Sequence, residues 1–431
     1  MNTLPKILLA ISVVFCALAL GALAWLALQT TEVKDVRHSE AATFPEVRAA
    51  KKSSTTADQT VAAAESGNDG LTEKLSDLSA AEGVVPGELL LSFKSREALN
   101  AFLLRAGAEG IEVRHSDSRL LTARVKYKDP AKMAAELRKN ARDYKNIGAN
   151  YYIWVPGSPE KPEKDSANAG GSAPFESSAL DAIGATGDRS RWGAGVKVAV
   201  LDTGVTDHVT LKGLKITHTD LIKDGQAFHG HGTAMTSLIA GRDELNGGVA
   251  PASEILDIRV ADSTGRGDVA SVAQGIMHAV DQGARLINIS LGTTADASVL
   301  REAVAYARGR GVVVVAAAGN EQQAHLAYPA AYDGVISVAA VDANGTQAYF
   351  SNSGEGLFIS APGVGIVSGY SDNKMVIGNG TSQAAAITSG AVAALLSRNY
   401  ASSNIPQILT NNVVRVQAPA TQVGAGILHL P

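Results

Sequence analysis

The stretch Asn379–Leu396 reads NGTSQAAAITSGAVAALL and contains no charged side chain. Gly378 and Gly380 permit a sharp backbone turn, and the run after them is long enough for about four helical turns. A helix that is apolar on every face must be buried in the middle of a sizeable domain. Ser382 therefore lies where a tight loop becomes the positive end of a buried helix. That position suits a nucleophile as well as an ordinary N-cap, and this stretch alone leaves both interpretations open.

Upstream of this helix, apolar strands alternate with helical stretches from Arg191 onward. We expect strands at Lys197–Leu201, Ile255–Val260, Arg285–Ser290, Val312–Ala316 and Val335–Val341. We expect helices at Gly232–Gly241, Val269–Gly283, Ala297–Arg308 and Ser382–Ser397. Continuous apolar strands such as VVVVA are typical of a parallel sheet that is buried on both faces, so the predicted fold class is α/β. Open parallel sheets bind ligands beyond the carboxyl ends of their strands.

Three polar residues lie at such strand ends or helix starts. Asp202 ends the strand in VAVLDTGV, His231 opens the helix in FHGHGTAM, and Asn320 ends VVVVAAAGN. Each residue alone has an ordinary structural explanation, as a turn cap, a surface histidine or a turn amide. With Ser382 they supply an orienting acid, a general base, an oxyanion donor and a nucleophile. The set of four therefore predicts acyl transfer.

These motifs resemble the subtilisin family of serine proteases (subtilases) over about residues 180–430. The resemblance is carried by VAVLDTGV, GHGTAMTSLIAG, VVVVAAAGNE and GTSQAAAITSGAVAALL, in the family's order of Asp, His and Ser. It implies a mostly parallel sheet flanked by helices over residues 179–431, and a serine endopeptidase that hydrolyses peptide bonds through an acyl-enzyme. By the same resemblance, Asp202, His231 and Ser382 form the catalytic triad. Asn320 joins the Ser382 N–H in the oxyanion hole.

The resemblance also implies that a protein or peptide substrate binds as an added strand, with glycines that let two backbones approach. The residues assigned to this binding are Gly265, Gly267, Ser290, Leu291, Gly292, Ala317, Ala318 and Gly319. His229 competes with His231 for the role of base, but only His231 is followed by the family's Gly-Thr. His229 is therefore expected on the surface or the rim.

The chain departs from the family pattern at three positions. Gln383 stands where the family has Met, Ala386 where it has Pro, and Ala234 where many members have His. None of these is a catalytic group. No Asp/Glu cluster has the spacing of a calcium loop, so no metal or cofactor is expected, and a structural calcium ion has no support.

Residues 86–155 have a different pattern, with strands and helices in the order β-α-β-β-α-β. The expected strands are Glu88–Lys94, Ile111–His115, Leu120–Tyr127 and Asn150–Val155, and the expected helices are Ser95–Ala106 and Pro130–Tyr144. This order predicts a small α+β, ferredoxin-like domain. Before a subtilase domain it resembles the family's inhibitory propeptide. We expect the prodomain to act in cis, with self-processing in the linker 156–178. A permanent accessory domain is the alternative.

Residues 7–28 form an uncharged apolar run of about 33 Å as a helix, enough to cross a bilayer. Residues 1–28 are therefore either a transmembrane anchor or a signal peptide cut near Ala24, and both predict an extracytoplasmic catalytic domain. Residues 29–85 lack periodicity and are expected to be a flexible linker. The single cysteine, Cys16, lies in the apolar run, which excludes a cysteine protease.

The net charge of −4 gives no electrostatic support for a nucleic-acid partner, and we expect a monomer. A catalytically inactive subtilase-fold protein that binds peptides is the rival hypothesis, which the intact set of four catalytic residues opposes. A nucleotide-binding α/β protein is a third hypothesis. The chain lacks both a G-x-G-x-x-G after its first strand and a P-loop, which argues against it.

Overall fold

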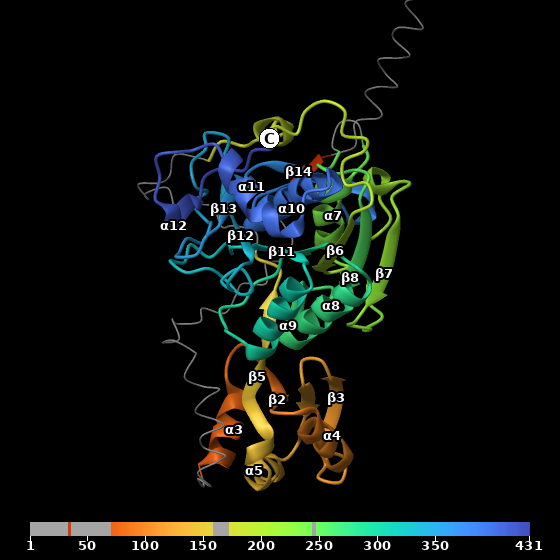
Figure 1. Cartoon of the computed structure of the whole chain (residues 1–431), viewed down its shortest axis with the longest axis vertical. Coiled ribbons are helices and arrows are strands. Elements are labelled where there is room, and N and C mark those ends of the chain that lie inside the picture. Colours follow the sequence, from red (N-terminus) through yellow and green to blue (C-terminus); the bar gives the residue numbers. More distant parts are fainter. Residues whose placement is uncertain (1–32, 36–69, 158–171, 244–246) are drawn as a thin grey trace, which may run out of the picture.

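A computed structural model describes residues 33–35, 70–157, 172–243 and 247–431 of the chain. Two domains are visible in Figure 1: a small N-terminal domain (70–157) and a larger C-terminal domain (172–431). The last strand of the N-terminal domain, β5, runs out of it toward the C-terminal domain.

The C-terminal domain is built on a seven-stranded parallel sheet in the order β13-β12-β11-β10-β6-β8-β7. Its strands are β6 (Lys197–Asp202), β7 (Ile216–Asp220), β8 (Glu254–Arg259), β10 (Leu286–Ile289), β11 (Val313–Ala317), β12 (Ile336–Val341) and β13 (Ile359–Pro362). Every residue of β10, β11, β12 and β13 is buried. This is the burial pattern of a parallel sheet covered on both faces.

Helices cover both faces of this sheet, so its strands contribute alternate side chains to two cores. Val198 and Val200 pack into one core with α7 (His231–Ala240) and α10 (Thr381–Ser397). Ala199 and Leu201 pack into the other core with α8 (Val269–Asp281) and α9 (Ser298–Gly309). The helices of the domain are α6 (Ala179–Ala182), α7 (His231–Ala240), α8 (Val269–Asp281), α9 (Ser298–Gly309), α10 (Thr381–Ser397), α11 (Ile405–Asn412) and α12 (Ala420–Val423). In α10 all residues from Thr381 to Leu396 are buried, so the charge-free stretch forms the predicted central helix.

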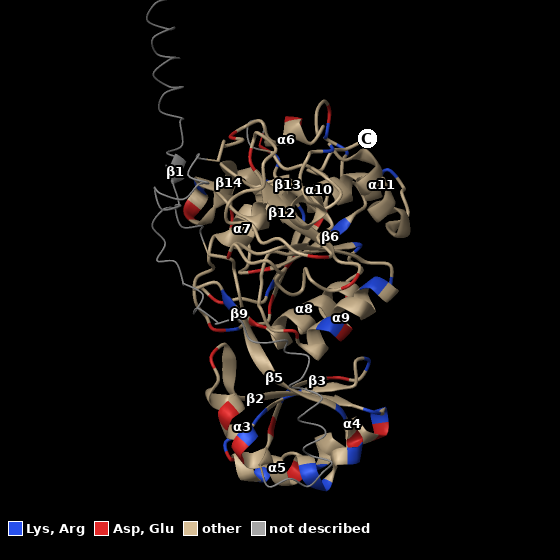
Figure 2. Ribbon diagram, turned by 90° about the vertical axis from the view of Figure 1, so that its left-hand side faces the viewer, with Lys and Arg blue, Asp and Glu red and all other residues tan. Residues whose placement is uncertain are grey.

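The N-terminal domain has the element order β-α-β-β-α-β after an initial helix. Its elements are α3 (Leu71–Ala80), β2 (Val84–Phe93), α4 (Arg96–Arg105), β3 (Glu112–Asp117), β4 (Thr122–Lys126), α5 (Pro130–Lys139) and β5 (Tyr144–Trp154). The four strands pair antiparallel in the order β3-β4-β2-β5. Charged residues gather on the outer helices α3, α4 and α5, away from the C-terminal domain (Figure 2).

The N-terminal elements differ from the predicted boundaries. Part of the expected linker 29–85 is ordered: Leu71 and Leu75 of α3 lie one helical turn apart, and both are fully buried in the domain core. Val33–Asp35 form the short strand β1, which pairs in parallel with β15 (Lys374–Gly378). The second helix ends at Lys139 instead of Tyr144, because the Tyr144 ring packs against Phe93 as the first residue of β5.

The C-terminal domain also contains elements that the hydrophobic pattern did not indicate. They are β7 and β13 at the two sheet edges, β9 (Arg266–Asp268), and the hairpin of β14 (Ile366–Tyr370) and β15. Strand β7 reads ITHTD and is half-buried, so it lacks a continuous apolar run. Part of the linker expected at 156–178 is ordered, because Phe175 is buried in the core and its N–H donates to the Val364 carbonyl.

The two alternatives for residues 7–28, an anchor or a signal peptide, concern residues that lie outside the described ranges. Residues 158–171, which make up most of the expected linker 156–178, also lie outside them. Within the described ranges, no helix combines the length and the apolar character that a membrane span needs.

The space around two helical glycines, Gly390 in α10 and Gly309 in α9, predicts opposite effects of alanine on stability. A Cβ at Gly390 would lie 2.6 Å from Val249 Cβ, whereas a Cβ at Gly309 in α9 would meet no atom within 4 Å. Gly390→Ala should therefore destabilise the domain by about 1–3 kcal/mol through overpacking. The matched change Gly309→Ala should stabilise it by up to about 1 kcal/mol through helix propensity. Thermal unfolding of both variants checks this, and a Gly390→Ala variant as stable as wild type would contradict it.

Candidate active site

Asp202 is the last residue of the central strand β6, and its side chain is fully buried. Both carboxylate oxygens accept from His231 Nδ1, at 2.8 and 3.0 Å. Oδ1 also accepts the Thr203 N–H at 2.7 Å. A buried carboxylate is costly unless hydrogen bonds compensate it, and these contacts provide that compensation. They require the proton on Nδ1 of His231, which leaves Nε2 free to act as a base.

His231 is the first residue of α7, and its side chain is 12 % exposed. Thr203 connects this helix start to the Asp202 loop. Its Oγ1 accepts the Gly232 N–H at 3.1 Å and donates to the His229 carbonyl at 2.8 Å. A Cβ at Gly232 would lie 2.5 Å from the Gly204 carbonyl oxygen, so only glycine allows the loop and the helix to approach this closely.

Asn320 follows β11 after Ala318 and Gly319. Its Oδ1 accepts both the N–H and the hydroxyl of Thr381, each at 2.9 Å, at the start of α10. Its Nδ2 donates to the Gly157 carbonyl oxygen at 3.2 Å. Gly319 has φ +108° and no space for a side chain, because a Cβ would lie 2.2 Å from Asn352 Nδ2. The amide donor of Asn320 is thus fixed in orientation and directed at a peptide carbonyl.

Ser382 is the second residue of α10, at the N-terminus of a 17-residue helix. The side chain is buried, and its Oγ donates to the Ser290 carbonyl at 3.5 Å. Further along α10, Ser389 donates to Asn288 Oδ1 of β10 at 2.9 Å, which ties the helix to the sheet. The long Ser382 contact is a weak hydrogen bond that the hydroxyl can exchange for another acceptor.

Three glycines that the sequence assigned to substrate binding lie against the end of β5. Trp154 and Gly292 exchange both backbone hydrogen bonds, at 3.0 and 2.8 Å. The Val155 N–H donates to the Gly265 carbonyl at 2.8 Å. Gly267, in β9, pairs with Ile153 of β5. Residues 153–155 of the chain therefore occupy the strand position between these glycines.

The remaining predicted binding residues lie deeper. Ser290 contributes the carbonyl that Ser382 contacts, and Leu291 is fully buried in the core next to α8 and α9. Ala317 belongs to the core on the α10 side, and Ala318 to a small separate cluster with Leu326, Ala339 and Leu357. Gly319 donates its N–H to Thr381 Oγ1 at 3.1 Å.

His229 packs beside the base instead of lying on the open surface. Its Nδ1 accepts the His231 N–H at 3.3 Å, and its Nε2 lies 3.4 Å from the Tyr370 hydroxyl. Burial lowers the pKa of His229, and the neighbouring His231 acts in the same direction. His229 thus caps the start of α7 in its neutral form. Thr203, Thr381 and Tyr370 also support the site, and no motif assigned a role to them because their partners are far apart in sequence.

Among the residues that the structure describes, no group of three or more His, Cys, Asp or Glu side chains is arranged to hold a metal ion.

Comparison with known proteins places this geometry in a family. The model of the Subtilase family matches residues 193–426. A thermostable alkaline protease of Halalkalibacterium halodurans is 39 % identical over 249 residues, which is 56 % of this chain and 68 % of that protein. Subtilisin Savinase of Lederbergia lenta is 39 % identical over 231 residues, 51 % of this chain and 82 % of the relative. The chain belongs to the subtilase family, as the motifs indicated.

A solved structure extends the comparison. Fervidolysin from Fervidobacterium pennivorans, described as a keratinolytic enzyme related to subtilisin, aligns with a TM-score of 0.68 and 26 % identity. The alignment covers 81 % of this chain and 61 % of fervidolysin, so the chain spans about three fifths of that protein's length. The predicted α/β fold, with its parallel sheet flanked by helices, is confirmed. The protein is a subtilisin-like serine endopeptidase.

The contacts of Asn320 predict how its variants behave. Asn320→Ala should lower kcat by roughly 10²–10³-fold, by analogy with the removal of an oxyanion donor from subtilisin. Asn320→Asp is the matched variant, because Asp keeps the Oδ1 acceptor for Thr381 but has no N–H to donate. It should lose kcat with little change in thermal stability. Steady-state kinetics and melting curves test this, and full activity in Asn320→Asp would rule out a donor role.

Proposed function

We propose that this protein is an exported serine endopeptidase that is made as a self-processing zymogen. Ser382 is the nucleophile, His231 the general base and Asp202 the acid that orients it. Asn320 and the Ser382 N–H form the oxyanion hole. The N-terminal domain is the prodomain, and it inhibits the enzyme by holding its last strand in the substrate cleft.

The Asp202–His231 contact supports the first step. The carboxylate holds Nδ1–H, so Nε2 takes the Ser382 proton as Oγ attacks the carbonyl carbon of the scissile bond. Asp202 then stabilises the imidazolium. His231 returns the proton to the leaving amine, and water hydrolyses the acyl-enzyme by the same route. Ser382 must exchange the weak Ser290 contact for His231, as catalytic hydrogen bonds often tighten only with substrate bound.

The observation that carries the proposal is the hydrogen bond from Asn320 Nδ2 to the Gly157 carbonyl oxygen, at 3.2 Å. In the proposed mechanism this donor binds the oxygen of the scissile peptide bond. Gly157 would then supply the acyl group, and the bond cut would be Gly157–Ser158. This lies at the start of the linker 156–178, where the sequence predicted processing.

The preceding residues support the same assignment, because they bind as a substrate strand would. Strand β5 pairs antiparallel with β9, through Tyr152 with Asp268 and Trp154 with Arg266. On its other side Trp154 pairs with Gly292. The sheet of the N-terminal domain therefore continues into the C-terminal domain through β9, in the β-augmentation mode of peptide binding (Figure 2).

Polar contacts hold the body of the N-terminal domain against α8. Arg124 of β4 donates to Glu88 in its own domain, at 2.8 Å, and to Asp268 at the N-cap of α8, at 3.0 Å. The fully buried Asn150 of β5 accepts the Ala270 N–H in the first turn of α8 at 3.2 Å. The N-terminal domain thus satisfies backbone and side-chain groups at a helix start that are otherwise open to water.

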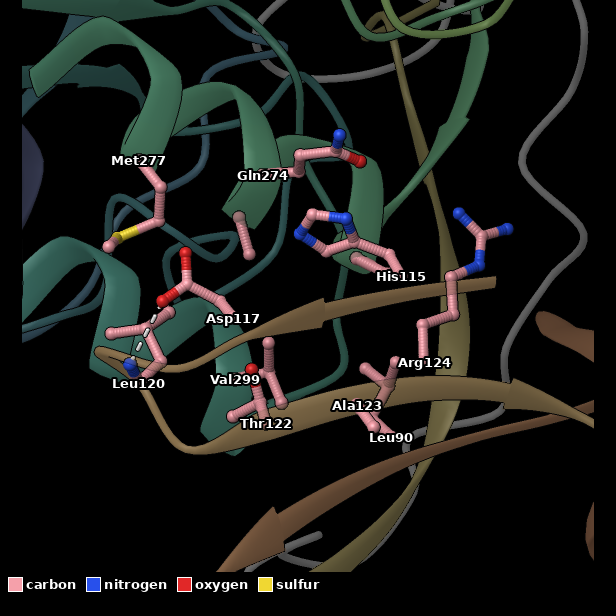
Figure 3. A pocket seen from close by; sticks show the side chains of 12 residues that line it. Leu90, His115, Asp117, Leu120, Thr122, Ala123, Arg124, Gln274, Met277 and Val299 are labelled. Atoms are coloured by element: carbon pink, nitrogen blue, oxygen red, sulfur yellow. Dashed lines mark hydrogen bonds between the residues drawn. The ribbon is translucent and has the colours of Figure 1, made fainter. Parts of the chain in front are cut away.

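The interface is not packed throughout. Figure 3 shows a pocket in which His115, Asp117 and Arg124 of the N-terminal domain face Gln274 and Met277 of α8. This interface is partly polar, as interfaces between domains of one chain generally are.

The comparison with fervidolysin is consistent with a prodomain, since the aligned 81 % of this chain exceeds what residues 172–431 can supply. The apolar run 7–28 supports export. Cleavage after Gly157 would separate the catalytic domain from that run, whether it is an anchor or a signal peptide.

Self-processing predicts a specific cleavage pattern. Purified full-length protein should convert to two fragments whose masses place the cut between Gly157 and Ser158. Ser382→Ala should stay intact, while Ser403→Ala, which changes an exposed serine far from the site, should process like wild type. Intact-mass spectrometry after incubation measures this.

Two outcomes would contradict different parts of the proposal. Cleavage of purified Ser382→Ala at the wild-type rate would refute self-processing. A wild-type cut elsewhere in 158–178 would refute the Gly157 assignment alone. Failure of the folded, processed wild type to react with a fluorophosphonate probe would favour the inactive peptide-binding protein.

Arg124 predicts how tightly the cleaved domain is retained. Arg124→Ala removes the hydrogen bonds that cross the interface to Asp268 and Ser271. A charged hydrogen bond is worth about 1.5–3 kcal/mol, so retention should weaken roughly 10–100-fold. Arg114→Ala is the matched control, because Arg114 pairs with Glu112 on its own strand and is well exposed. The lag before peptide hydrolysis begins should shorten in Arg124→Ala only. Equal lags in both variants would show that Arg124 does not hold the domain.

A further inference from the structure

A second Asp–His pair lies close to the catalytic one and belongs to none of the catalytic motifs. Asp257 of β8 has 1 % of its surface exposed, and its Oδ2 accepts from His218 Nδ1 of β7 at 2.8 Å. The His218 side chain is 55 % exposed. A buried carboxylate is thus joined to solvent through one imidazole.

The strand register places this pair on the same face of the sheet as the catalytic aspartate. Val200 of β6 pairs with Asp257, and Asp202 pairs with Arg259, while His218 is the partner of Asp257 on the other side. Residues two apart on a strand point to the same face, so Asp202 and Asp257 share one. They lie on adjacent strands, offset by two residues in the register.

The same carboxylate also holds the loop that follows Asp202. Asp257 Oδ2 accepts the Val205 N–H at 3.0 Å, and the next N–H, of Thr206, donates to Thr233 Oγ1 of α7 at 2.9 Å. The loop is therefore fixed between β8 and the helix that begins with His231. The other oxygen, Asp257 Oδ1, is buried and has no hydrogen-bond partner among the described residues. The charge of Asp257 is thus only partly compensated by local contacts.

We propose that His218 and Asp257 are positioning residues for the Asp202–His231 pair. Asp257 anchors the loop behind Asp202, and protonated His218 neutralises the carboxylate, so that a solvent-accessible imidazole sets the charge next to the catalytic pair. This inference rests on the roles proposed above for Asp202 and His231.

The surrounding charges are consistent with this arrangement. The charged groups that act electrostatically on Asp257 are His218 and Asp202, and Asp207 acts on His218. Arg259, the nearest cation on β8, is directed at Asp220 and Asp224 instead. Burial raises the pKa of Asp257, while the His218 hydrogen bond opposes that rise. The hydrogen bond to Asp257 raises the pKa of His218.

The sign of the pH dependence follows from the His218 shift. A histidine whose pKa is raised by folding contributes stability fully below its unfolded value of about 6.5, and this contribution disappears as the pH rises through the folded value. Above that pH the carboxylate of Asp257 keeps the Val205 N–H as a donor but loses the positive charge that neutralised it beside Asp202. The pair is therefore most effective as an anchor on the acid side of neutrality.

The test is the pH profile of kcat/KM for peptide hydrolysis. The enzyme is the protein that forms when the full-length chain has processed itself. Asp257→Asn keeps an oxygen for the Val205 N–H but removes a negative charge near His231. The imidazolium of His231 is then less stabilised, and the acid limb should move to lower pH by about 0.5–1 unit at the effective dielectric of a protein. His218→Asn keeps a donor near the Nδ1 position but removes the positive charge, so the acid limb should move to higher pH.

Two controls separate positioning from general damage. His278→Asn changes a neighbouring histidine of α8 that bonds Thr219 and does not contact Asp257, so its profile should match wild type. In an Asp257→Asn background, His218→Asn should no longer shift the profile, because there is no carboxylate left to neutralise. Should Asp257→Asn fold poorly in a melting curve, the exposed His218 variant carries the test.

The outcomes are distinguishable. Profiles of His218→Asn and Asp257→Asn that superimpose on an active wild type would overturn the proposal and leave the proposed function intact. Activity that persists in His231→Ala would instead overturn the function on which the inference rests.

Discussion

The structure of the active site depends on the burial of one carboxylate, that of Asp202. The side chain has no contact with solvent, and an ionised carboxylate in such a place must be compensated by several donors. The Thr203 N–H and His231 Nδ1 supply them, which requires the loop after β6 and the start of α7 to meet at close range. Gly232 makes that approach sterically allowed. The ring of His231 is thus oriented by the same contacts that make the buried charge tolerable.

At α10, too, one contact both stabilises the structure and orients a polar group of the site. Asn320 uses its oxygen to satisfy Thr381 at the helix start, which directs its two amide hydrogens away from the helix. The structural contact therefore orients the amide that we propose as the oxyanion donor, so one side chain would serve both purposes. The edge formed by β9 and Gly292 is equally dual. It completes a sheet with β5 in the intact chain. When that strand leaves, the backbone groups that it had paired with would be free to bind an external peptide.

The family, the fold class and the type of enzyme could all be predicted from the sequence. The composition of an element can show whether it is buried. The continuous apolar run of β11 and the absence of charge in α10 both indicate elements that are buried on all sides. The motifs around Asp202, His231 and Ser382 are short contiguous stretches, so they can be recognised in the sequence without three-dimensional information. Edge elements were missed for the corresponding reason. Strand β7 is half-buried and polar, and α3 buries only Leu71 and Leu75 of its ten residues, so neither differs enough from a loop in a single sequence.

By itself, the sequence determined the family and the α/β fold, and it predicted which residues carry out acyl transfer, because strand ends and helix starts place polar side chains at one edge of a parallel sheet. Only the tertiary structure decided which distant groups meet them. The Gly157 carbonyl lies 163 residues from Asn320, and the contact between them depends on how β5 leaves one domain and joins another. Asp257 and His218 are likewise brought together by the register of β7 against β8. Such contacts leave no local pattern, since each partner alone is compatible with many folds.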